Sequence, residues 1–103
     1  MNLHAKLTQR AAEGRPVRIG LIGAGKFGSM YLAQVPRTPG VHLAAIADLS
    51  PDGARRNLAR VGWEDGRTHA SSIDQALREG TTWIGEDWEA LVRHPAIDVV
   101  VEC

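Results

Sequence analysis

In "VRIGLIGAGKFGSMYLAQV", residues 17–35, an apolar run is followed by glycines and then by a helical pattern. From Val17 to Ile22 the residues are mostly β-branched or leucine, as is typical of a strand covered on both faces of a parallel sheet. The apolar residues after the glycines are about one helical turn apart: Phe27, Met30, Tyr31 and Val35. The stretch therefore predicts a strand, a glycine turn and a helix in that order.

The glycine turn matches the pattern G-x-G-x-x-G. Its residues are Gly23, Ala24, Gly25, Lys26, Phe27 and Gly28. In this pattern the first glycine allows the sharp turn, the second lets a pyrophosphate approach the backbone, and the third lets helix and strand pack closely. The free N–H groups at the start of the following helix then point at the phosphates. The six residues are thus predicted to hold the pyrophosphate of a dinucleotide, although the pattern alone is common.

Asp48 makes the prediction of a dinucleotide site more specific than the glycine pattern alone does. A second apolar stretch, Val41 to Ala47, predicts a buried strand, and Asp48 follows it 20 residues after Gly28. A carboxylate at that place can accept hydrogen bonds from the adenosine ribose hydroxyls. The alternatives are a phosphate-free turn with Asp48 as a plain strand-end residue, or a site for S-adenosylmethionine or FAD.

The residues leave the choice between NAD and NADP open. Asp48 repels a 2′-phosphate and so favours NAD, whereas Arg55 and Arg56 lie early in the next predicted helix and could neutralise that phosphate. Base rates favour a solvated helix face for both arginines. Lys26 is expected near the pyrophosphate or, alternatively, as an exposed residue at a helix start.

The rest of the chain alternates helices and strands. Beyond the segments above, the patterns predict a helix over 2–13, a helix after the N-cap Ser50, a polar surface loop over 63–71, a helix from Ser72 to Gly80, a short strand in 81–85, a helix after the N-cap Asp87, and a strand from Ile97 to Cys103. The fold class is α/β: a Rossmann-type parallel sheet of about four strands with flanking helices. We expect residues 1–15 to form an N-terminal helix and residues 16–103 to form a truncated dinucleotide-binding domain.

Composition excludes several classes of function. The chain of 103 residues has 12 basic and 12 acidic side chains and no long run of either sign, so nucleic acid is not an expected partner. It has one cysteine and no apolar run of about 18 residues, so we expect neither an internal disulfide nor a membrane span, and we assign the chain to the cytoplasm. The four histidines lack ligand spacing, so no metal site is predicted, and the three tryptophans are assigned to packing.

Three segments together resemble a known group of enzymes. The segments "VRIGLIGAGKFG", "VHLAAIADLSPDGARR" and "GEDWEALVRHPAIDVVVEC" resemble the nucleotide-binding domain of the homoserine dehydrogenase-like and Gfo/Idh/MocA-like oxidoreductases. The N-terminal helix and the insertion at about 63–82 are most similar to a reductoisomerase-like branch, some members of which act on 1-deoxy-D-xylulose 5-phosphate in isoprenoid synthesis with NADPH. The resemblance implies NAD or NADP as cofactor.

The resemblance also implies that the catalytic domain follows the last strand. By the strand order 3-2-1-4, the last strand lies beside the first, so Glu102 and Cys103 are expected to face the nicotinamide half of the site. Cys103 has no companion for a nucleophilic or metal-binding role. We therefore expect the chain to be the cofactor-binding part of a homo-oligomeric oxidoreductase, to meet substrate only through a further domain, and to have no catalytic residues of its own. The alternative is a non-catalytic module that senses the nucleotide.

Overall fold

The structure is a computed structural model that describes residues 3–23 and 38–102. The elements in this part of the chain are α1 (Leu3–Ala12), β1 (Val17–Ile22), β2 (Val41–Ala47), α3 (Pro51–Arg60), the 3₁₀ helix η3 (Asp65–Arg67), α4 (Ile73–Glu79), β3 (Trp83–Gly85), α5 (Trp88–Arg93) and β4 (Val99–Glu102). The helix predicted after the glycine turn lies outside the described residues. In the described part, the predicted order of helices and strands is confirmed.

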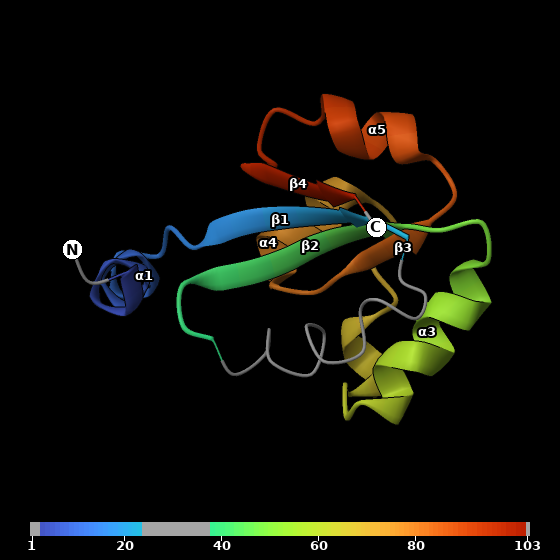
Figure 1. The fold of residues 1–103 in the computed structure, drawn as a ribbon, viewed down its shortest axis with the longest axis horizontal. Helices are drawn as coiled ribbons and strands as arrows, with labels where there is room; N and C mark the ends of the chain where they lie inside the picture. The colour runs from blue at the N-terminus through green and yellow to red at the C-terminus, as the bar shows by residue number, and fades with distance from the viewer. Residues whose placement is uncertain (1–2, 24–37, 103) are drawn as a thin grey trace.

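The four strands form one parallel sheet in the order β3-β2-β1-β4 (Figure 1). The two central strands begin and end where the sequence predicts, because each is a continuous apolar run bounded by turn residues. Since all strands run the same way, their carboxyl ends meet at one edge of the sheet. The fold is α/β with a parallel sheet flanked by helices, as expected for a Rossmann-like domain.

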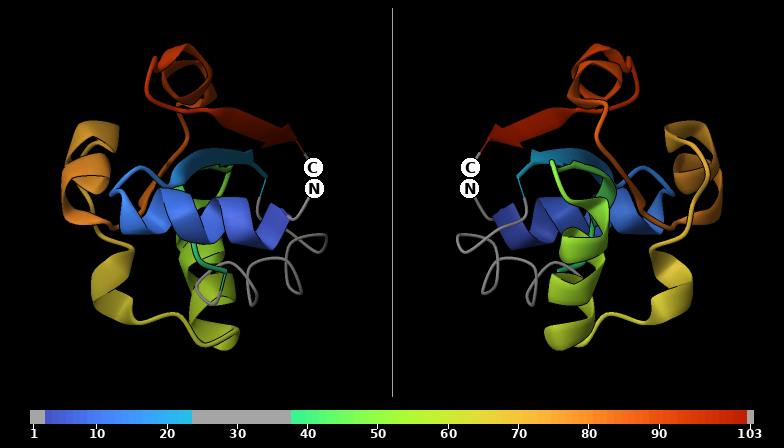
Figure 2. Two further views of the ribbon diagram at one scale, coloured as in Figure 1. Left: turned by 90° about the vertical axis from the view of Figure 1, so that its left-hand side faces the viewer. Right: turned by 90° about the vertical axis from the view of Figure 1, so that its right-hand side faces the viewer.

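Helices cover both faces of the sheet. On one face, Ala54 and Leu58 of α3 pack against Ile19, Leu21 and other strand residues. On the other face, Ile73 of α4 and Leu91 of α5 pack against small side chains of β2. Figure 2 looks along the strands and shows α3 and α5 on opposite sides of the sheet. The two faces therefore have separate apolar cores.

Gly20 explains why α5 can lie so close to β1. A Cβ at this position would stand 2.6 Å from Cδ2 of Leu91, well inside van der Waals contact. Leu91 is fully buried, so it has no room to move aside. The glycine in the middle of β1 is thus required by the packing of α5.

Each of the three α-helices after β2 begins at the predicted cap. The side chains of Ser50, Ser72 and Asp87 accept hydrogen bonds from the backbone N–H groups of Gly53, Gln75 and Ala90. Gly80 ends α4 in the left-handed conformation. Short polar residues before apolar helical patterns therefore located these helices correctly.

The predicted surface loop over 63–71 is wrong in part. Thr68 and Ala70 are buried, Ala70 forms a β-bridge with Trp83, and Trp63 packs against the core on the α3 side. The loop can be buried because its backbone finds partners: the Thr68 carbonyl accepts a hydrogen bond from Nε of Arg55. The segment is thus exposed over most of its length but contributes Thr68 and Ala70 to the interior.

The last strand is shorter and more exposed than expected. The sequence predicts a strand from Ile97, but β4 begins at Val99, because the N–H of Ile97 bonds to the His94 carbonyl in a turn. Val99 and Val100 are both exposed by more than two fifths, since β4 is an edge strand in the described part of the chain.

Candidate functional site

A cavity of about 220 Å³ opens at the carboxyl ends of β1, β2 and β3. Its lining residues are Ile22, Gly23, Ala47, Asp48, Leu49, Glu86 and Trp88. These residues follow or end three neighbouring strands, so the cavity lies where ligands bind in open parallel sheets. Two of them, Gly23 and Asp48, are predicted site residues, and the structure brings them together.

Gly23 makes the sharp turn that the sequence predicts. Its φ angle is +83°, which favours glycine, and its N–H donates to the Ala47 carbonyl at 2.7 Å. The chain thus leaves β1 beside the end of β2. The other five residues of the motif, Ala24, Gly25, Lys26, Phe27 and Gly28, lie outside the described residues.

Asp48 is held in place by its own backbone and by the start of α3. Its N–H donates to the Gly85 carbonyl at 2.9 Å, and its Oδ1 accepts the N–H of Ser50 at 2.8 Å. Ser50 in turn caps α3 through the N–H of Gly53. The carboxylate is half-buried at the cavity wall, with an orientation set by this local turn.

Glu86 and Trp88 line the cavity although no prediction assigns them to it. Glu86 directly follows β3, and the N–H of Trp88 donates to the Glu86 carbonyl at 2.9 Å. The assignment of Trp88 to packing is wrong, because the residue is 55% exposed. The sequence carried a usable signal: in a parallel sheet the residue after each strand lies at the same edge.

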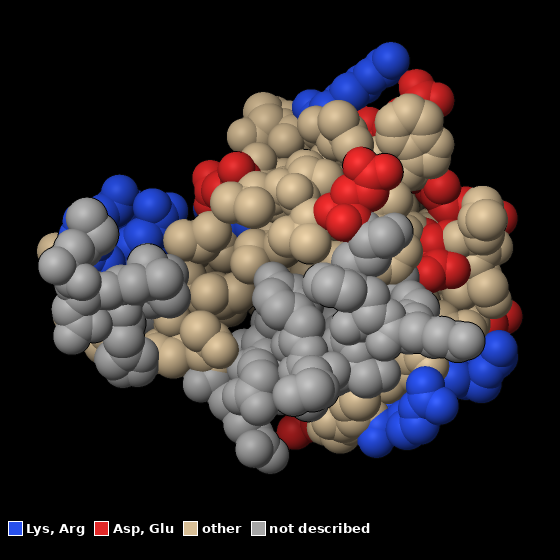
Figure 3. Space-filling model, in the orientation of Figure 1, with Lys and Arg blue, Asp and Glu red and all other residues tan. Residues whose placement is uncertain are grey.

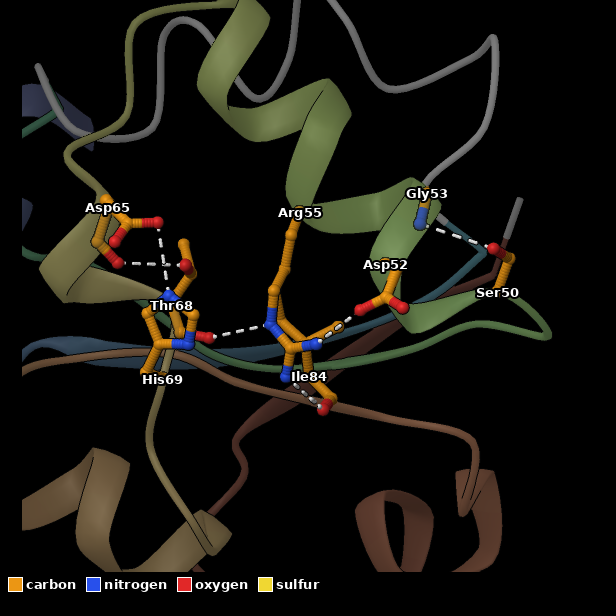
Figure 4. Close-up of polar contacts among 8 residues, drawn as sticks. All are labelled: Ser50, Asp52, Gly53, Arg55, Asp65, Thr68, His69 and Ile84. Atoms are coloured by element: carbon orange, nitrogen blue, oxygen red, sulfur yellow. Dashed lines mark hydrogen bonds and ion pairs between the residues drawn. The ribbon is translucent and has the colours of Figure 1, made fainter.

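The Arg55 side chain is held by hydrogen bonds to the backbone and by an ion pair. Figure 4 shows its side chain reaching from α3 to the neighbouring loop and strand. Its guanidinium donates to the Thr68 carbonyl at 3.2 Å and the Ile84 carbonyl at 3.3 Å, and pairs with Asp52 at 3.2 Å. The predicted contact of Arg55 with a 2′-phosphate stays a prediction, and Arg55 is not among the described residues that line the cavity.

Glu102 lies at the same edge of the sheet, on the other side of β1. It pairs with Ile22 in the β1–β4 ladder and is exposed, while Cys103 lies outside the described residues. The predicted strand order is confirmed, because β4 lies beside β1. The predicted contact of Glu102 with a nicotinamide ring stays a prediction.

A second cavity, of about 280 Å³, lies beside α4 and α5 and contains a histidine. Both nitrogens of His94 are occupied: Nδ1 accepts the N–H of Ala96 at 3.1 Å, and Nε2 donates to Asp74 at 2.7 Å. With this tautomer the imidazole has no lone pair left to act as a base. The His94–Asp74 pair therefore links α4 to the end of α5.

Metal binding and membrane insertion find no support in residues 3–23 and 38–102. Within these ranges no three His, Cys, Asp or Glu side chains gather closely enough to hold a metal ion. No helix there combines the length and apolar content needed to cross a membrane.

Comparisons with models of protein families and with curated proteins find no match.

Proposed function

We propose that this chain is the NAD(P)-binding part of an oxidoreductase, in which the cavity at the strand ends holds the adenosine half of the dinucleotide. The observation that carries the proposal is that Gly23 and Asp48 line the same cavity at the ends of neighbouring parallel strands. The glycine pattern over Gly23 to Gly28 and the resemblance to homoserine dehydrogenase-like and Gfo/Idh/MocA-like enzymes support it.

The lining fits an adenosine in both its polar and its apolar parts. Asp48 offers carboxylate lone pairs to the ribose hydroxyls, and its hydrogen bond from Ser50 fixes the direction in which they point. Trp88 and Leu49 are exposed at the same opening and provide apolar surface for the purine ring. The polar and the apolar part of the lining both support an adenosine-binding role for the cavity.

The remaining parts of the cofactor fall to residues that the sequence nominates. The pyrophosphate would be held by backbone N–H groups of Ala24 to Gly28, with Lys26 close by. The nicotinamide, which supplies a hydride in such enzymes, would then lie toward Glu102. Substrate binding and proton transfer would fall to a further domain, as the resemblance to the reductoisomerase-like branch implies; a nucleotide-sensing module is the alternative that uses the same site without chemistry.

S-adenosylmethionine is a second candidate ligand, favoured by one observation. Two carboxylates, Asp48 and Glu86, line the cavity, and they suit a ligand that shares the adenosine but carries a positive sulfonium in place of phosphates. A methyltransferase domain would then bind S-adenosylmethionine and neither form of the dinucleotide.

Calorimetric titration of the 103-residue chain with NADH, NADPH and S-adenosylmethionine tests the proposal. We expect a dinucleotide to bind and S-adenosylmethionine not to bind. Gly25→Val should abolish dinucleotide binding and keep the circular dichroism spectrum, because a side chain at the second motif glycine blocks the pyrophosphate. Gly66→Val is the matched control, since Gly66 lies in η3 with nothing within 4 Å of a Cβ. A folded chain that binds neither dinucleotide contradicts the proposal.

A further inference from the structure

We infer that the hydrogen bond between His94 and Asp74 positions the candidate site: it sets the tilt of α5 and thereby holds Trp88 at the cavity wall. The inference rests on the proposed function, in which Trp88 is part of the apolar surface for the purine ring. It assigns a role to two residues that no motif nominates and that lie outside the cavity lining.

The helix α5 rests on the sheet through one side chain. It has six residues, of which Leu91 is buried and the other five are exposed. Leu91 lies over Gly20, with Cδ2 2.6 Å from the place of a Cβ there, and belongs to the apolar core on that face of the sheet. A single contact near the middle of a short helix holds the helix against the sheet but does not by itself set its tilt.

The two ends of α5 differ in their polar contacts. At the start, the Asp87 carboxylate accepts the N–H of Ala90, so this bond stays within the helix and its cap. At the end, Nε2 of His94 donates to Oδ1 of Asp74 at 2.7 Å, and Asp74 belongs to α4. Within residues 3–23 and 38–102, no other polar side-chain contact joins residues 87–94 to another element. The bond to Asp74 therefore limits how far α5 can tilt.

His94 is suited to this role because its own ring is held. Nδ1 accepts the N–H of Ala96 at 3.1 Å, which fixes the orientation of the imidazole and leaves the proton on Nε2 for Asp74. The His94 side chain is 17% exposed, so the bond is partly shielded from water. The Asp74 side chain is 72% exposed, so its replacement should leave the fold intact.

Trp88 lies at the other end of α5 from His94. The two residues are about 9 Å apart along the helix axis, at a rise of about 1.5 Å per residue. Trp88 lines the cavity together with Asp48. Because a helix this short moves as a rigid body, a tilt about Leu91 that releases the His94 end also shifts Trp88 relative to Asp48. The bond between His94 and Asp74 thus sets the spacing between the surface for the purine and the carboxylate for the ribose.

The other ion pair of α5 lies within the helix. Glu89 and Arg93 pair at 3.3 Å, and both side chains are more than half exposed. Figure 3 shows acidic and basic side chains at the top of the molecule, where Figure 1 draws α5. Glu89→Ala removes an ion pair of the same helix without releasing α5 from α4, so it is the matched control.

Titration of NADH and NADPH into the wild-type chain and into variants of Asp74 tests the inference. Asp74→Ala should weaken binding of the preferred dinucleotide about threefold to fivefold, because Trp88 is no longer held in place. Asp74→Asn should stay within about twofold of the wild-type affinity, since its amide oxygen still accepts the Nε2 proton of His94. Glu89→Ala should also stay within about twofold.

A double-mutant cycle with Trp88→Ala separates positioning from a general loss of stability. The double variant Trp88→Ala/Asp74→Ala should bind the dinucleotide as tightly as Trp88→Ala alone, because no indole is left to be positioned. Four results overturn the inference while the proposed function stands: losses that multiply in the double variant, wild-type affinity in Asp74→Ala or in Trp88→Ala, a loss in Asp74→Asn equal to that in Asp74→Ala, and the same loss in Glu89→Ala. A folded wild-type chain that binds neither dinucleotide overturns the proposed function itself.

Discussion

The two ends of the parallel sheet use their polar groups differently. At the amino end, Arg18 and Asp98 are joined by two hydrogen bonds of 2.8 Å, and the buried Thr82 hydroxyl donates to the Leu43 carbonyl at 2.6 Å. At the carboxyl end, Leu49 is 93% exposed and Trp88 is 55% exposed beside a cavity. At the amino end these groups bond to other groups of the domain, whereas the carboxyl end presents polar and aromatic groups outward.

We therefore expect substitutions at the amino end to affect stability and substitutions at the carboxyl end to affect binding. Changes at the amino end remove contacts that the folded chain makes with itself, so they should alter the free energy of unfolding and not ligand affinity. Changes at the carboxyl end should do the reverse, because a ligand would make the missing contacts. Variants at the two ends therefore test whether stability and binding are separate.

The largest expected effect is at Thr82, at the amino end. Thr82→Val keeps the volume of the side chain but removes the donor to the Leu43 carbonyl, so the free energy of unfolding should fall by about 1–2 kcal/mol. Urea denaturation measures this change, and dinucleotide affinity should not move.

The neighbouring Thr81 provides a matched control. Its buried Oγ1 has no hydrogen-bond partner among the described residues, so Thr81→Val removes a hydroxyl whose burial is uncompensated. This variant should be as stable as the wild-type chain or more stable. Equal destabilisation by the two substitutions would show that the hydrogen bond of Thr82 is not the cause.

A smaller effect is expected at Trp88, at the carboxyl end. Trp88→Ala removes the exposed aromatic wall of the cavity and should weaken dinucleotide binding about threefold to tenfold, a cost of about 1 kcal/mol. Val92→Ala is the control, because Val92 is the other exposed large apolar residue of α5 and does not line the cavity. Calorimetric titration of both variants measures the difference; equal affinities would remove Trp88 from the site.

Local signals explain how much of the fold could be predicted. The bounds of β1 and β2 and the caps at Ser50, Ser72 and Asp87 depend on residues close together in the sequence, and all are observed. The burial of Thr68 is a tertiary feature that a local pattern does not carry: its carbonyl accepts a hydrogen bond from Arg55, 13 positions earlier. The polar residues of 63–71 indicated a surface loop, but Thr68 is buried and bonds to a residue of another element.

In the candidate site too, only the residues that a short sequence pattern joins could be predicted. Gly23 and Asp48 were predicted because a known pattern joins them at a fixed spacing, and the structure places both at one cavity. Glu86 is adjacent to Asp48 through the pairing of β2 with β3, so finding it required the strand order as well as a short pattern. The sequence located one side of the cavity, and the sheet register supplied the other.

The smallest expected effect is a pH dependence at His42, at the amino end. Burial lowers the pKa of the imidazole below its ordinary value, Arg18 and Arg67 lower it further, and the hydrogen bond between Nε2 and the Thr81 carbonyl opposes them. As the pH falls, the unfolded chain therefore takes up a proton at His42 before the folded chain does. The stability that the folded chain has while His42 is neutral in both states is fully present above about pH 6.5, and it is lost as the pH falls through the folded-state pKa.

His42→Gln keeps a donor for the Thr81 carbonyl and does not titrate, so its free energy of unfolding should decline less between about pH 7 and pH 5. Urea denaturation across that range measures both slopes; at about pH 8, where the imidazole is neutral in both states, the two proteins should be similarly stable. Parallel profiles would show that His42 does not couple protonation to the amino end of the sheet.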